Sequence, residues 1–443
     1  MLGLMSDLTL EPITAPFDVT ITPPGSKSLT NRALVLAALG AGTSRLTNVL
    51  LADDTLAMIE GLRRLGFALE VDEESCAVTV AGRGGAVPAA SAELQCGNSG
   101  TTIRFLTALC GLGRGEYVLD GVARMRQRPI GQLVDLLKNL GVRAEYVLET
   151  GFPPVRVAGD GLPGGMAHYG AAQSSQFLSA VVQVCPYARN EVRISLGAPQ
   201  TSWPYVAMTM QLMDEFGVTP ELHRDPKSGE PVEIIIPQGV YRPTRYDVEP
   251  DASSASYFLA AAAIHAGSKV TIRGLGKRSL QGDVGFADLL HQMGADLVFG
   301  RDFITVMGSG RLTGIEADMS GMPDMAQTLG AVALFAEGPT RMGGLHTLRV
   351  KETDRVAALS NELRKLGAEV TIDGDVMSIE PPRQIAPATL DTYEDHRMAM
   401  SLAVVGTNAA GITLRGAECV SKTYPGFFGD MERLRSTGGP AAV

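Results

Sequence analysis

The chain has 443 residues, of which 45% are hydrophobic and 19% charged, and its formal net charge is −10. This length allows two or three domains with a buried core. The acidic balance argues against a general nucleic-acid binder or a protein of anionic membranes, because both need a basic surface. It leaves room for a local cationic pocket.

The five cysteines of the chain (Cys76, Cys96, Cys110, Cys185 and Cys419) have no CxxC or His-rich spacing. We therefore expect reduced thiols in a cytoplasmic protein, with no disulfide frame and no metal site. The first residues lack the basic segment of a signal peptide, and no apolar run approaches the ~20 residues that a membrane span needs. We expect no membrane partner.

An Ala-rich apolar segment occurs six times along the chain, and it predicts six buried helices. The copies begin at Asn31, Thr102, Ser175, Ala255, Met325 and His396. Each has almost no polar face, which is typical of a helix that is covered on all sides. After each comes a small-residue break and a short β-like run.

Five of the copies continue into an amphipathic helix that ends in a hydrophobic residue followed by glycine. These glycines are Gly66, Gly141, Gly217, Gly294 and Gly367, about 75 residues apart. The full pattern of a copy is strand, helix, strand, helix, strand, strand. In the fourth copy, Gly300-Arg301-Asp302 is typical of a hairpin turn between the last two strands. Such a period indicates a repeat architecture.

Three units followed by three units predict an α/β protein of two similar domains, each with three βαβαββ repeats and buried helices. We expect one discontinuous domain of residues 1–25 and 249–443, and an inserted domain of residues 26–248. The N-terminal strand should join the C-terminal half, because the sixth unit is cut short at its end. A linear solenoid is the less favoured alternative, since its units are usually shorter.

Capping residues mixed with basic residues precede the apolar helices. The segments are PPGSKSLTNR, GNSGTTIR, AAQSSQ, DASSAS, GMPDMAQ and YEDHR. Helix N-termini carry unpaired N–H groups and a partial positive charge, so several together form an anion site. Basic residues at or near helix starts add to this charge: Lys27, Arg32, Arg104, Arg128, Lys351, Arg355, Arg397 and Lys422. The pattern predicts a small, multiply anionic substrate held between the two domains.

Each motif alone also has a simpler structural explanation. GSKS does not complete a P-loop, and Lys351 and Arg355 could belong to a solvated, salt-bridged helix. Asp324 could be an ordinary N-cap, and His396 a structural histidine. A functional role is favoured because basic and acidic residues recur at the same point of five repeats.

At these residues the chain resembles the enolpyruvyl transferase family, and within it the 5-enolpyruvylshikimate-3-phosphate synthases. The motifs PPGSKSLTNRALVLAAL, GNSGTTIRFL, RPIGQLVDLL, SSQ, LRVKETDR, DHRMAMSLA and SKTYPGF occur in family order over essentially the whole chain. The resemblance implies two domains of three βαβαββ units with the site in the cleft. It also implies transfer of the enolpyruvyl group of phosphoenolpyruvate to the 5-hydroxyl of shikimate 3-phosphate. Phosphate is released by addition and elimination through a tetrahedral intermediate.

The resemblance also implies site residues. For shikimate 3-phosphate they are Lys27, Ser28, Arg32, Ser174, Ser175, Gln176, Ser202, Tyr205, Asp324 and Lys351, with Arg32 on the carboxylate and the serines on the phosphate. For phosphoenolpyruvate they are Lys27, Gly100, Arg128, Gln176, Arg355, Arg397 and Lys422. Asp324 matches the proton acceptor for the hydroxyl and Glu352 the proton donor to C3, with Lys27 a further candidate for proton transfer. No cofactor is implied, and we expect a monomer.

The chain departs from the family pattern at two positions. Thr347 stands where some relatives have Asn, and Phe105 stands where many have Pro, which could change how that helix begins. Gly100 keeps the small residue of glyphosate-sensitive members, so we expect a sensitive enzyme.

Two alternatives remain open from the sequence. A UDP-N-acetylglucosamine enolpyruvyl transferase shares the fold and the donor, but it usually carries a Cys in the loop before its RP motif. The corresponding stretch here, DGVARMRQRPIG, has none. A non-catalytic anion-binding protein is a less favoured alternative, since it would need no pair such as Asp324 and Glu352.

Overall fold

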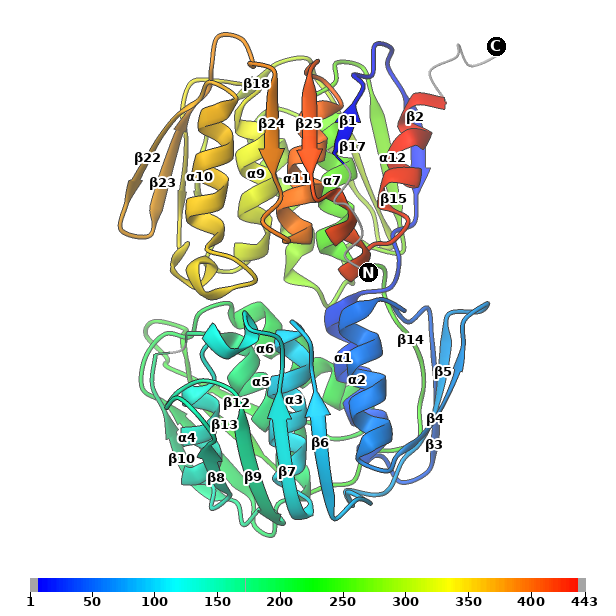
Figure 1. Ribbon diagram of the computed structural model, residues 1–443, viewed down its shortest axis with the longest axis vertical. Helices are drawn as coiled ribbons and strands as arrows, with labels where there is room; N and C mark the ends of the chain where they lie inside the picture. The colour runs from blue at the N-terminus through cyan, green and yellow to red at the C-terminus, as the bar shows by residue number, and fades with distance from the viewer. Residues whose placement is uncertain (1–6, 172, 437–443) are drawn as a thin grey trace. The chain divides into compact units, whose positions relative to one another are not determined.

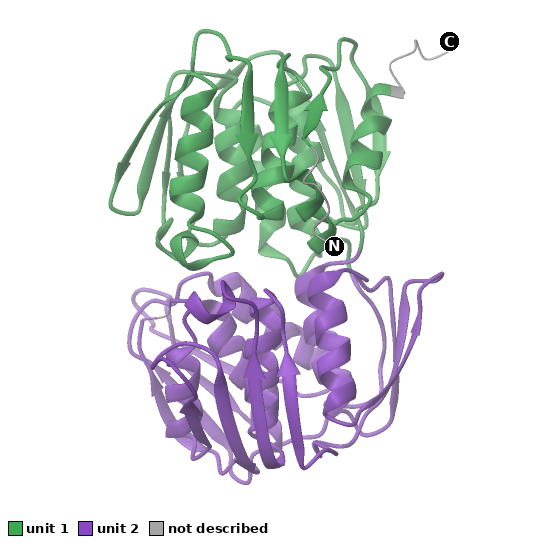
Figure 2. Ribbon diagram, in the orientation of Figure 1, with its two compact units in different colours: residues 1–24, 249–443 green, residues 25–248 purple. Residues whose placement is uncertain are grey.

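The structure is a computed structural model that describes residues 7–171 and 173–436. The chain forms two compact units, coloured separately in Figure 2. Unit 1 comprises residues 1–24 and 249–443, and unit 2 comprises residues 25–248. The first boundary between the two units falls after residue 24, one residue before the expected domain boundary, and the second falls after residue 248 as expected. The assignment of these units as two domains stays a prediction. Part of the segment considered as a signal peptide, residues 1–6, lies outside the described residues.

Unit 2 contains three four-stranded sheets of one topology. In order across the first sheet, the strands are β14 (Arg245–Asp247), β3 (Thr43–Thr47), β5 (Ala77–Ala81) and β4 (Ala68–Asp72). Across the second they are β6 (Ser91–Gln95), β7 (Arg114–Asp120), β9 (Val155–Asp160) and β8 (Arg143–Tyr146). Across the third they are β10 (Gly165–Tyr169), β11 (Val192–Leu196), β13 (Pro231–Ile236) and β12 (Glu221–Arg224). The first two strands of each sheet are parallel, and the later pairs are antiparallel.

Unit 1 repeats this topology in two sheets. They are β2 (Asp18–Ile21), β15 (Lys269–Arg273), β17 (Phe303–Met307) and β16 (Asp296–Phe299); and β19 (Glu316–Asp318), β21 (Thr340–Gly343), β23 (Val376–Glu380) and β22 (Glu369–Asp373). A third sheet has three strands, β24 (Ala388–Asp391), β25 (Ile412–Arg415) and β1 (Leu8–Leu10). A short pair, β18 (Leu312–Thr313) and β20 (Ala336–Glu337), lies apart from these sheets.

Strands from distant parts of the chain complete three sheets. β1 pairs antiparallel with β25, the strand that follows α11 (His396–Gly406). β2 pairs in parallel with β15, and β14 pairs in parallel with β3. The N-terminal segment therefore supplies strands to unit 1. β14, the last strand of unit 2, is the edge strand beside β3 in the first sheet of that unit.

The apolar helices of the repeats are buried among the sheets of their own unit (Figure 1). They are α1 (Lys27–Leu39), α3 (Gly100–Cys110) and α5 (Ser175–Val184) in unit 2, and α7 (Ala252–Ala263), α9 (Ala326–Ala333) and α11 (His396–Gly406) in unit 1. All residues of α3 and α7 are buried. The predicted βαβαββ class with buried helices is confirmed, and the helix cores of Ala, Leu, Val and Met explain the low aromatic content.

The second helices and short 3₁₀ segments lie between the strands. The helices are α2 (Asp53–Arg64), α4 (Gly131–Asn139), α6 (Trp203–Glu215), α8 (Phe286–Gln292), α10 (Arg355–Lys365) and α12 (Phe427–Ser436). The 3₁₀ segments are η1 (Met125–Gln127), η2 (Cys185–Tyr187), η3 (Gly282–Gly285), η4 (Pro323–Met325), η5 (His346–Val350) and η6 (Ala417–Lys422). The glycines that end α2, α4, α6, α8 and α10 all have positive φ, from 86° to 114°. The repeated glycine thus stops each helix in a left-handed conformation that other residues rarely adopt.

Several helices begin earlier than their apolar runs. α1 starts at Lys27, four residues before Asn31, because the Ser26 hydroxyl accepts a hydrogen bond from the N–H of Leu29 at 3.4 Å. α3 starts at Gly100 rather than Thr102. The polar motif residues therefore belong to the first helical turn, where side chains reach the unpaired N–H groups.

Over the described part of the chain, no helix combines the length and the apolar character that a membrane crossing requires. Residues 7–171 and 173–436 contain no group of three or more His, Cys, Asp or Glu side chains placed to hold a metal ion. The cysteines are unpaired.

Candidate active site

Three buried helices of unit 2 begin with a serine cap. Ser26, Ser99 and Ser174 accept hydrogen bonds from backbone N–H groups of the first turns of α1, α3 and α5, at 3.3–3.4 Å. A hydroxyl cap satisfies one N–H group and brings no negative charge. The partial positive charge of each helix start is therefore not cancelled by its cap, and an anion is favoured there.

Lys27, the first residue of α1, is paired with a carboxylate. Its Nζ lies 3.2 Å from Oδ2 of Asp54 in α2, and the two side chains are 13% and 4% exposed. Asp54 holds the ammonium group at the helix start. The sequence contained no motif around Asp54, so its role could not be found there.

Arg32 is buried and fixed by contacts from three segments of unit 2. Its Nε donates to Thr209 at 2.7 Å, Nη1 to the carbonyl of Ser28 at 2.9 Å, and Nη2 to Ser179 and to the carbonyl of Tyr205 at 3.3 and 3.2 Å. Burial lowers the pKa of Arg32 to about 9, so the guanidinium stays charged at neutral pH. The structure brings Ser28, Arg32 and Tyr205 together.

Phe105, one of the departures from the family pattern, packs against this arginine. The guanidinium carbon of Arg32 lies 5.2 Å from the centre of the Phe105 ring, within the range of a cation–π contact. α3 runs through Phe105 without interruption. A phenylalanine here thus covers one face of a buried cation.

Gln176 connects the second and third repeats. Its Oε1 accepts from Nη1 of Arg104, and its Nε2 donates to Thr101 at 3.3 Å. Arg104 also donates to the carbonyl of Pro129 at 3.1 Å and stacks over Phe177, 4.9 Å from the ring centre. Arg104 was named as part of the basic set but was not among the predicted site residues.

The remaining predicted serines of unit 2 lie at helix starts. Ser175 is buried in the first turn of α5. Ser202 precedes α6 with φ 54° and ψ 39°, a left-handed conformation that is unusual for a residue with a side chain. Such strained positions persist only where the surroundings hold them, and they concentrate at binding sites.

Gly100 lies directly beneath the guanidinium of Arg128. Nη1 of Arg128 donates to the backbone carbonyl and the side-chain oxygen of Asn98, at 2.9 and 3.2 Å. A Cβ atom at Gly100 would lie 2.6 Å from Nη2 of Arg128. Any side chain at this position must therefore displace the arginine, which Asn98 holds on its other side.

Unit 1 contains a second cluster, in which carboxylates lie among the basic residues. Asp324, in η4, contacts three cations: Oδ1 lies 3.3 Å from Nζ of Lys351 and 3.0 Å from Nη1 of Arg355, and Oδ2 lies 3.1 Å from Nη2 of Arg397. The Asp324 side chain is 16% exposed, and all three of its cationic partners contact its carboxylate oxygens.

Arg355 is the centre of this cluster, and its side chain is 1% exposed. Besides Asp324, it contacts Oε2 of Glu352 at 3.0 Å and both oxygens of Asp395 at 2.7 and 3.1 Å. Glu352 Oε1 lies 3.4 Å from Nζ of Lys422. Asp395 appeared in the EDHR motif, but the sequence did not show that it would hold Arg355.

The charges of the cluster shift the protonation of its members. Burial by itself would raise the pKa of Asp324, but the charges of Arg397, Lys351 and Arg355 outweigh it and hold that pKa far below its usual value. Burial would lower the pKa of Arg355, and Asp395, Glu352 and Asp324 raise it. Burial lowers the pKa of Lys351. Asp324 is therefore an ionised carboxylate at neutral pH.

Thr347, the second departure, is buried in η5. Its hydroxyl has no hydrogen-bond partner among the described residues. The structure offers no account of a threonine at this position.

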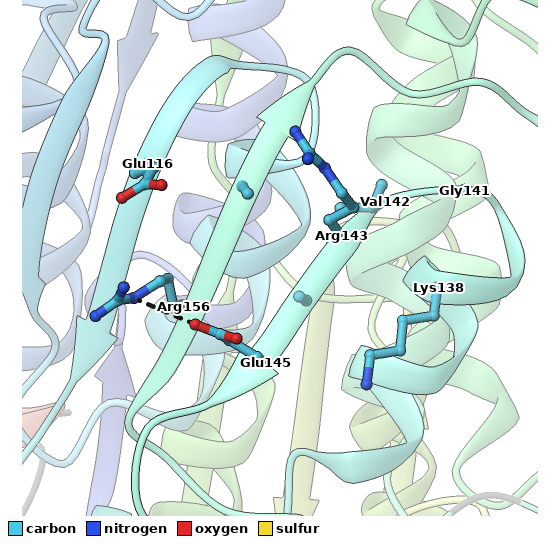
Figure 3. Close-up of a pocket in the computed structure, with 9 residues that line it drawn as sticks. Glu116, Lys138, Gly141, Val142, Arg143, Glu145 and Arg156 are labelled. Carbon is cyan, nitrogen blue, oxygen red and sulfur yellow. Dashed lines mark ion pairs between the residues drawn. The ribbon is translucent and has the colours of Figure 1, made fainter.

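A surface cavity of about 610 Å³ in unit 2 has none of the predicted site residues in its lining (Figure 3). It is lined by exposed acids and bases on β7, β8, β9 and the end of α4, including Lys138, Arg143 and Glu116. Arg156 and Glu145 within it pair with each other at 3.6 Å. This cavity therefore contains none of the residues that the sequence predicts for the site.

The chain was compared with known proteins. Residues 13–431 match the family model of EPSP synthase (3-phosphoshikimate 1-carboxyvinyltransferase). A 3-phosphoshikimate 1-carboxyvinyltransferase of Shewanella denitrificans is 46% identical over 431 residues, which is 97% of this chain and 99% of the relative. One of Vibrio vulnificus is 43% identical over 433 residues, with 97% and 99% coverage.

A solved structure gives the same result for the fold. The EPSP synthase of Acinetobacter baumannii superposes with a TM-score of 0.80 and 27% sequence identity, covering 97% of this chain and 98% of that one. These comparisons support the main interpretation of the sequence rather than the UDP-sugar alternative. The chain belongs to the EPSP synthase family, the 3-phosphoshikimate 1-carboxyvinyltransferases of the shikimate pathway.

Proposed function

We propose that one catalytic cycle uses both clusters to transfer the enolpyruvyl group of phosphoenolpyruvate to the 5-hydroxyl of shikimate 3-phosphate. One observation carries the proposal: Asp324 and Glu352 lie in one cluster, together with Lys351, Arg355 and Lys422. The reaction needs cations to bind two anionic substrates and an acid and a base to move protons. Anion binding by itself requires the cations but no acid–base pair such as Asp324 and Glu352.

In this proposal, shikimate 3-phosphate is bound largely by the serine-capped helix starts of unit 2. Arg32, held rigidly by its neighbours, takes the carboxylate, and the phosphate is held by hydroxyl groups. Its full set is Lys27, Ser28, Arg32, Ser174, Ser175, Gln176, Ser202 and Tyr205, with Asp324 and Lys351 from unit 1. Arg and Ser side chains suit these groups because they donate several directed hydrogen bonds to oxyanions.

Phosphoenolpyruvate is bound by the basic residues, and Gly100 leaves room for one of them. The proposed set is Lys27, Gly100, Arg128, Gln176, Arg355, Arg397 and Lys422. Planar guanidinium groups bind carboxylate and phosphate oxygens in pairs, which orients the donor as well as holding it.

Proton transfer follows from the contacts of the two carboxylates. The substrate hydroxyl adds its oxygen to C2 of phosphoenolpyruvate and yields its proton to Asp324, while the C2–C3 electron pair takes a proton from Glu352. In the elimination step, the Glu352 carboxylate takes a proton from C3 and the C2–C3 double bond forms again. The C2–O bond breaks, and its electron pair leaves with phosphate, which receives the proton held by Asp324. Lys27 is a further candidate for one of these transfers.

Substrate binding is also expected to prepare Asp324 as a base. In the free protein, Arg397, Lys351 and Arg355 hold the pKa of Asp324 far below its usual value against the effect of burial, which makes it a weak base. When the anionic groups of phosphoenolpyruvate engage Arg397 and Arg355, they neutralise part of this positive charge. The pKa of Asp324 then rises toward a useful value.

The deciding experiment measures phosphate released from phosphoenolpyruvate by the purified protein. We expect release that depends on shikimate 3-phosphate and is about 10²–10⁴-fold slower in Asp324→Asn and Glu352→Gln. Release driven by UDP-N-acetylglucosamine would support the alternative transferase instead. Binding of both anions by folded protein without any release would support the non-catalytic alternative.

The assembly and location of the protein are part of the same proposal. We propose a cytoplasmic monomer; the unpaired thiols, of which Cys96, Cys110 and Cys185 are buried, support the reducing compartment and do not bear on the oligomeric state. Sedimentation equilibrium should give a single species near the chain mass of 46.7 kDa. A mass that doubles over the working concentration range would contradict the monomer.

A further inference from the structure

The segment between β24 and α11 makes hydrogen bonds to side chains of α10 at two points. Near the start of α10, Arg355 contacts both carboxylate oxygens of Asp395. Further along the helix, Glu362 Oε1 accepts a hydrogen bond from the hydroxyl of Tyr393 at 2.6 Å, and Oε2 accepts one from the N–H of Asp391 at 3.0 Å. Arg355 and Glu362 are two helical turns apart and share one face of α10.

Between these two points the backbone is strained. Tyr393 has φ 56° and Glu394 has φ 54°, so two consecutive residues with side chains adopt the left-handed conformation. This conformation costs free energy for any L-residue other than glycine. It persists only where neighbouring groups hold it.

Glu362 binds this turn through a carboxylate that is itself held in place. Its carboxylate is fully buried and paired with Nζ of Lys365 at 2.7 Å. Tyr393 is 36% exposed, and its partial burial together with the bond to Glu362 raises the pKa of its hydroxyl, which keeps the proton that it donates. On the other side of the turn, Thr392 donates to the carbonyls of Arg415 and Gly416, both at 2.9 Å.

The turn positions Asp395 beside Arg355 in the cluster of unit 1. Asp395 is fully buried, and it also caps α11 by accepting from the N–H of Arg397 at 2.9 Å. Arg355 divides its donors between Asp395, Asp324 and Glu352. If the turn relaxed, Asp395 would move away from Arg355, and the guanidinium would shift toward the two remaining carboxylates.

We propose that the Tyr393–Glu362 hydrogen bond is a positioning device for the catalytic cluster of unit 1. It holds the strained turn, the turn places Asp395, and Asp395 fixes Arg355 for phosphoenolpyruvate. The inference rests on the proposed function of Arg355. Tyr393 and Glu362 act through other residues, so both are positioning residues.

The test is Tyr393→Phe in the full chain, assayed by steady-state kinetics with each substrate varied. We expect KM for phosphoenolpyruvate to rise about fivefold, as for the loss of one ordinary hydrogen bond. KM for shikimate 3-phosphate should stay within about twofold, because most of its proposed contacts lie in unit 2. The matched control is Tyr117→Phe, which loses a hydroxyl bond to the carbonyl of Ala89 in unit 2 and should leave both KM values unchanged.

A second substitution distinguishes positioning from a general loss of stability. Adding Glu394→Gly to Tyr393→Phe should restore most of the KM for phosphoenolpyruvate, because glycine adopts the left-handed conformation without strain. A purely structural role would change the unfolding temperature but not this KM. If Tyr393→Phe does not fold, Glu362→Gln keeps an acceptor for the hydroxyl and should raise the same KM by a smaller factor.

Unchanged KM for phosphoenolpyruvate in the soluble variants would overturn the inference, as would an equal rise in both KM values. Absence of rescue by Glu394→Gly would also count against it. These outcomes leave the proposed function intact, since the wild-type chain would still release phosphate in the presence of shikimate 3-phosphate. A wild-type chain without such release would overturn the proposed function, and the inference with it.

Discussion

The two charged clusters contain the same basic residue types in different surroundings. In unit 2, serines cap the three apolar helices α1, α3 and α5, and the carboxylate paired with Lys27 is Asp54. In unit 1, aspartates cap α7, α10 and α11, and three carboxylates surround Arg355. A cation whose neighbours are hydroxyls is available to an anion, whereas a cation among carboxylates also tunes their protonation.

The difference teaches how repeated units can diverge in function. Five of the six apolar helices begin with a side-chain cap, serine in α1, α3 and α5 and aspartate in α7 and α11, and the choice of cap sets the local charge. A serine leaves the helix start positive, and an aspartate neutralises it. The comparison predicts that substitutions in unit 1 act mainly on turnover and those in unit 2 mainly on binding.

The largest effect is expected from the carboxylates of unit 1. Asp324→Asn and Glu352→Gln should each lower kcat by about 10²–10⁴-fold, the usual contribution of a general acid or base. Binding of shikimate 3-phosphate, measured by calorimetry, should weaken far less than kcat falls. A variant with normal kcat and weakened binding would remove the distinction between the clusters.

The matched change in unit 2 is Ser174→Ala. We expect KM for shikimate 3-phosphate to rise about tenfold through loss of a phosphate contact, with part of the effect coming from the lost helix cap. The value of kcat should stay within about threefold. Steady-state kinetics with shikimate 3-phosphate as the varied substrate checks this, and a collapse of kcat alone would contradict it.

Gly100→Ala tests the space beneath Arg128. The new Cβ would lie 2.6 Å from Nη2, so the guanidinium must move away from its position against Asn98. We expect KM for phosphoenolpyruvate to rise about tenfold, equivalent to roughly 1.4 kcal/mol of lost binding. The parent enzyme should be inhibited by glyphosate and the variant should tolerate it, so an insensitive parent would refute this prediction.

A smaller effect concerns stability in acid. The folded-state pKa of Asp324 lies below its unfolded value because the charges of Arg397, Lys351 and Arg355 outweigh its burial. The resulting stabilisation is complete above the unfolded pKa of about 3.9 and is lost as pH falls through the folded value. The difference in unfolding temperature between wild type and Asp324→Asn should therefore be constant near neutrality and shrink below about pH 4. A difference in unfolding temperature that widens in acid would contradict this prediction.

The smallest effect is expected from Phe105→Leu. The ring covers Arg32, and an exchange for leucine keeps the helix but loses the cation–π contact, worth about 0.5–2 kcal/mol. KM for shikimate 3-phosphate should rise a few-fold with kcat unchanged. Unaltered binding would mean that the ring serves only packing.

Much of the fold could be predicted from the sequence because its signals are local. Helices without a polar face, glycines after each second helix and polar residues at each helix start depend on neighbours within a few residues. These local signals predict six repeats and the βαβαββ class. The helix starts at Lys27 and Gly100 lay a few residues earlier than the apolar runs, because serine caps extend each helix through its polar motif.

The partners of the motif residues could not be predicted in the same way. Asp54, Thr209 and Asp395 hold Lys27, Arg32 and Arg355. Asp54 and Thr209 belong to no motif that was recognised, and Asp395 was seen only as part of a charged run. Nothing local distinguishes such a residue from an ordinary helical aspartate or threonine.

The sequence by itself determined the repeat, the buried helices, the chain positions that carry charge and, through its motifs, the family. The tertiary structure decided which charges meet and which strands close the sheets. β1 pairs with β25 across almost the whole chain, and Arg32 meets Thr209 across 177 residues. The physical reason is that helix formation and capping are short-range, whereas ion pairing and sheet closure depend on how distant segments pack.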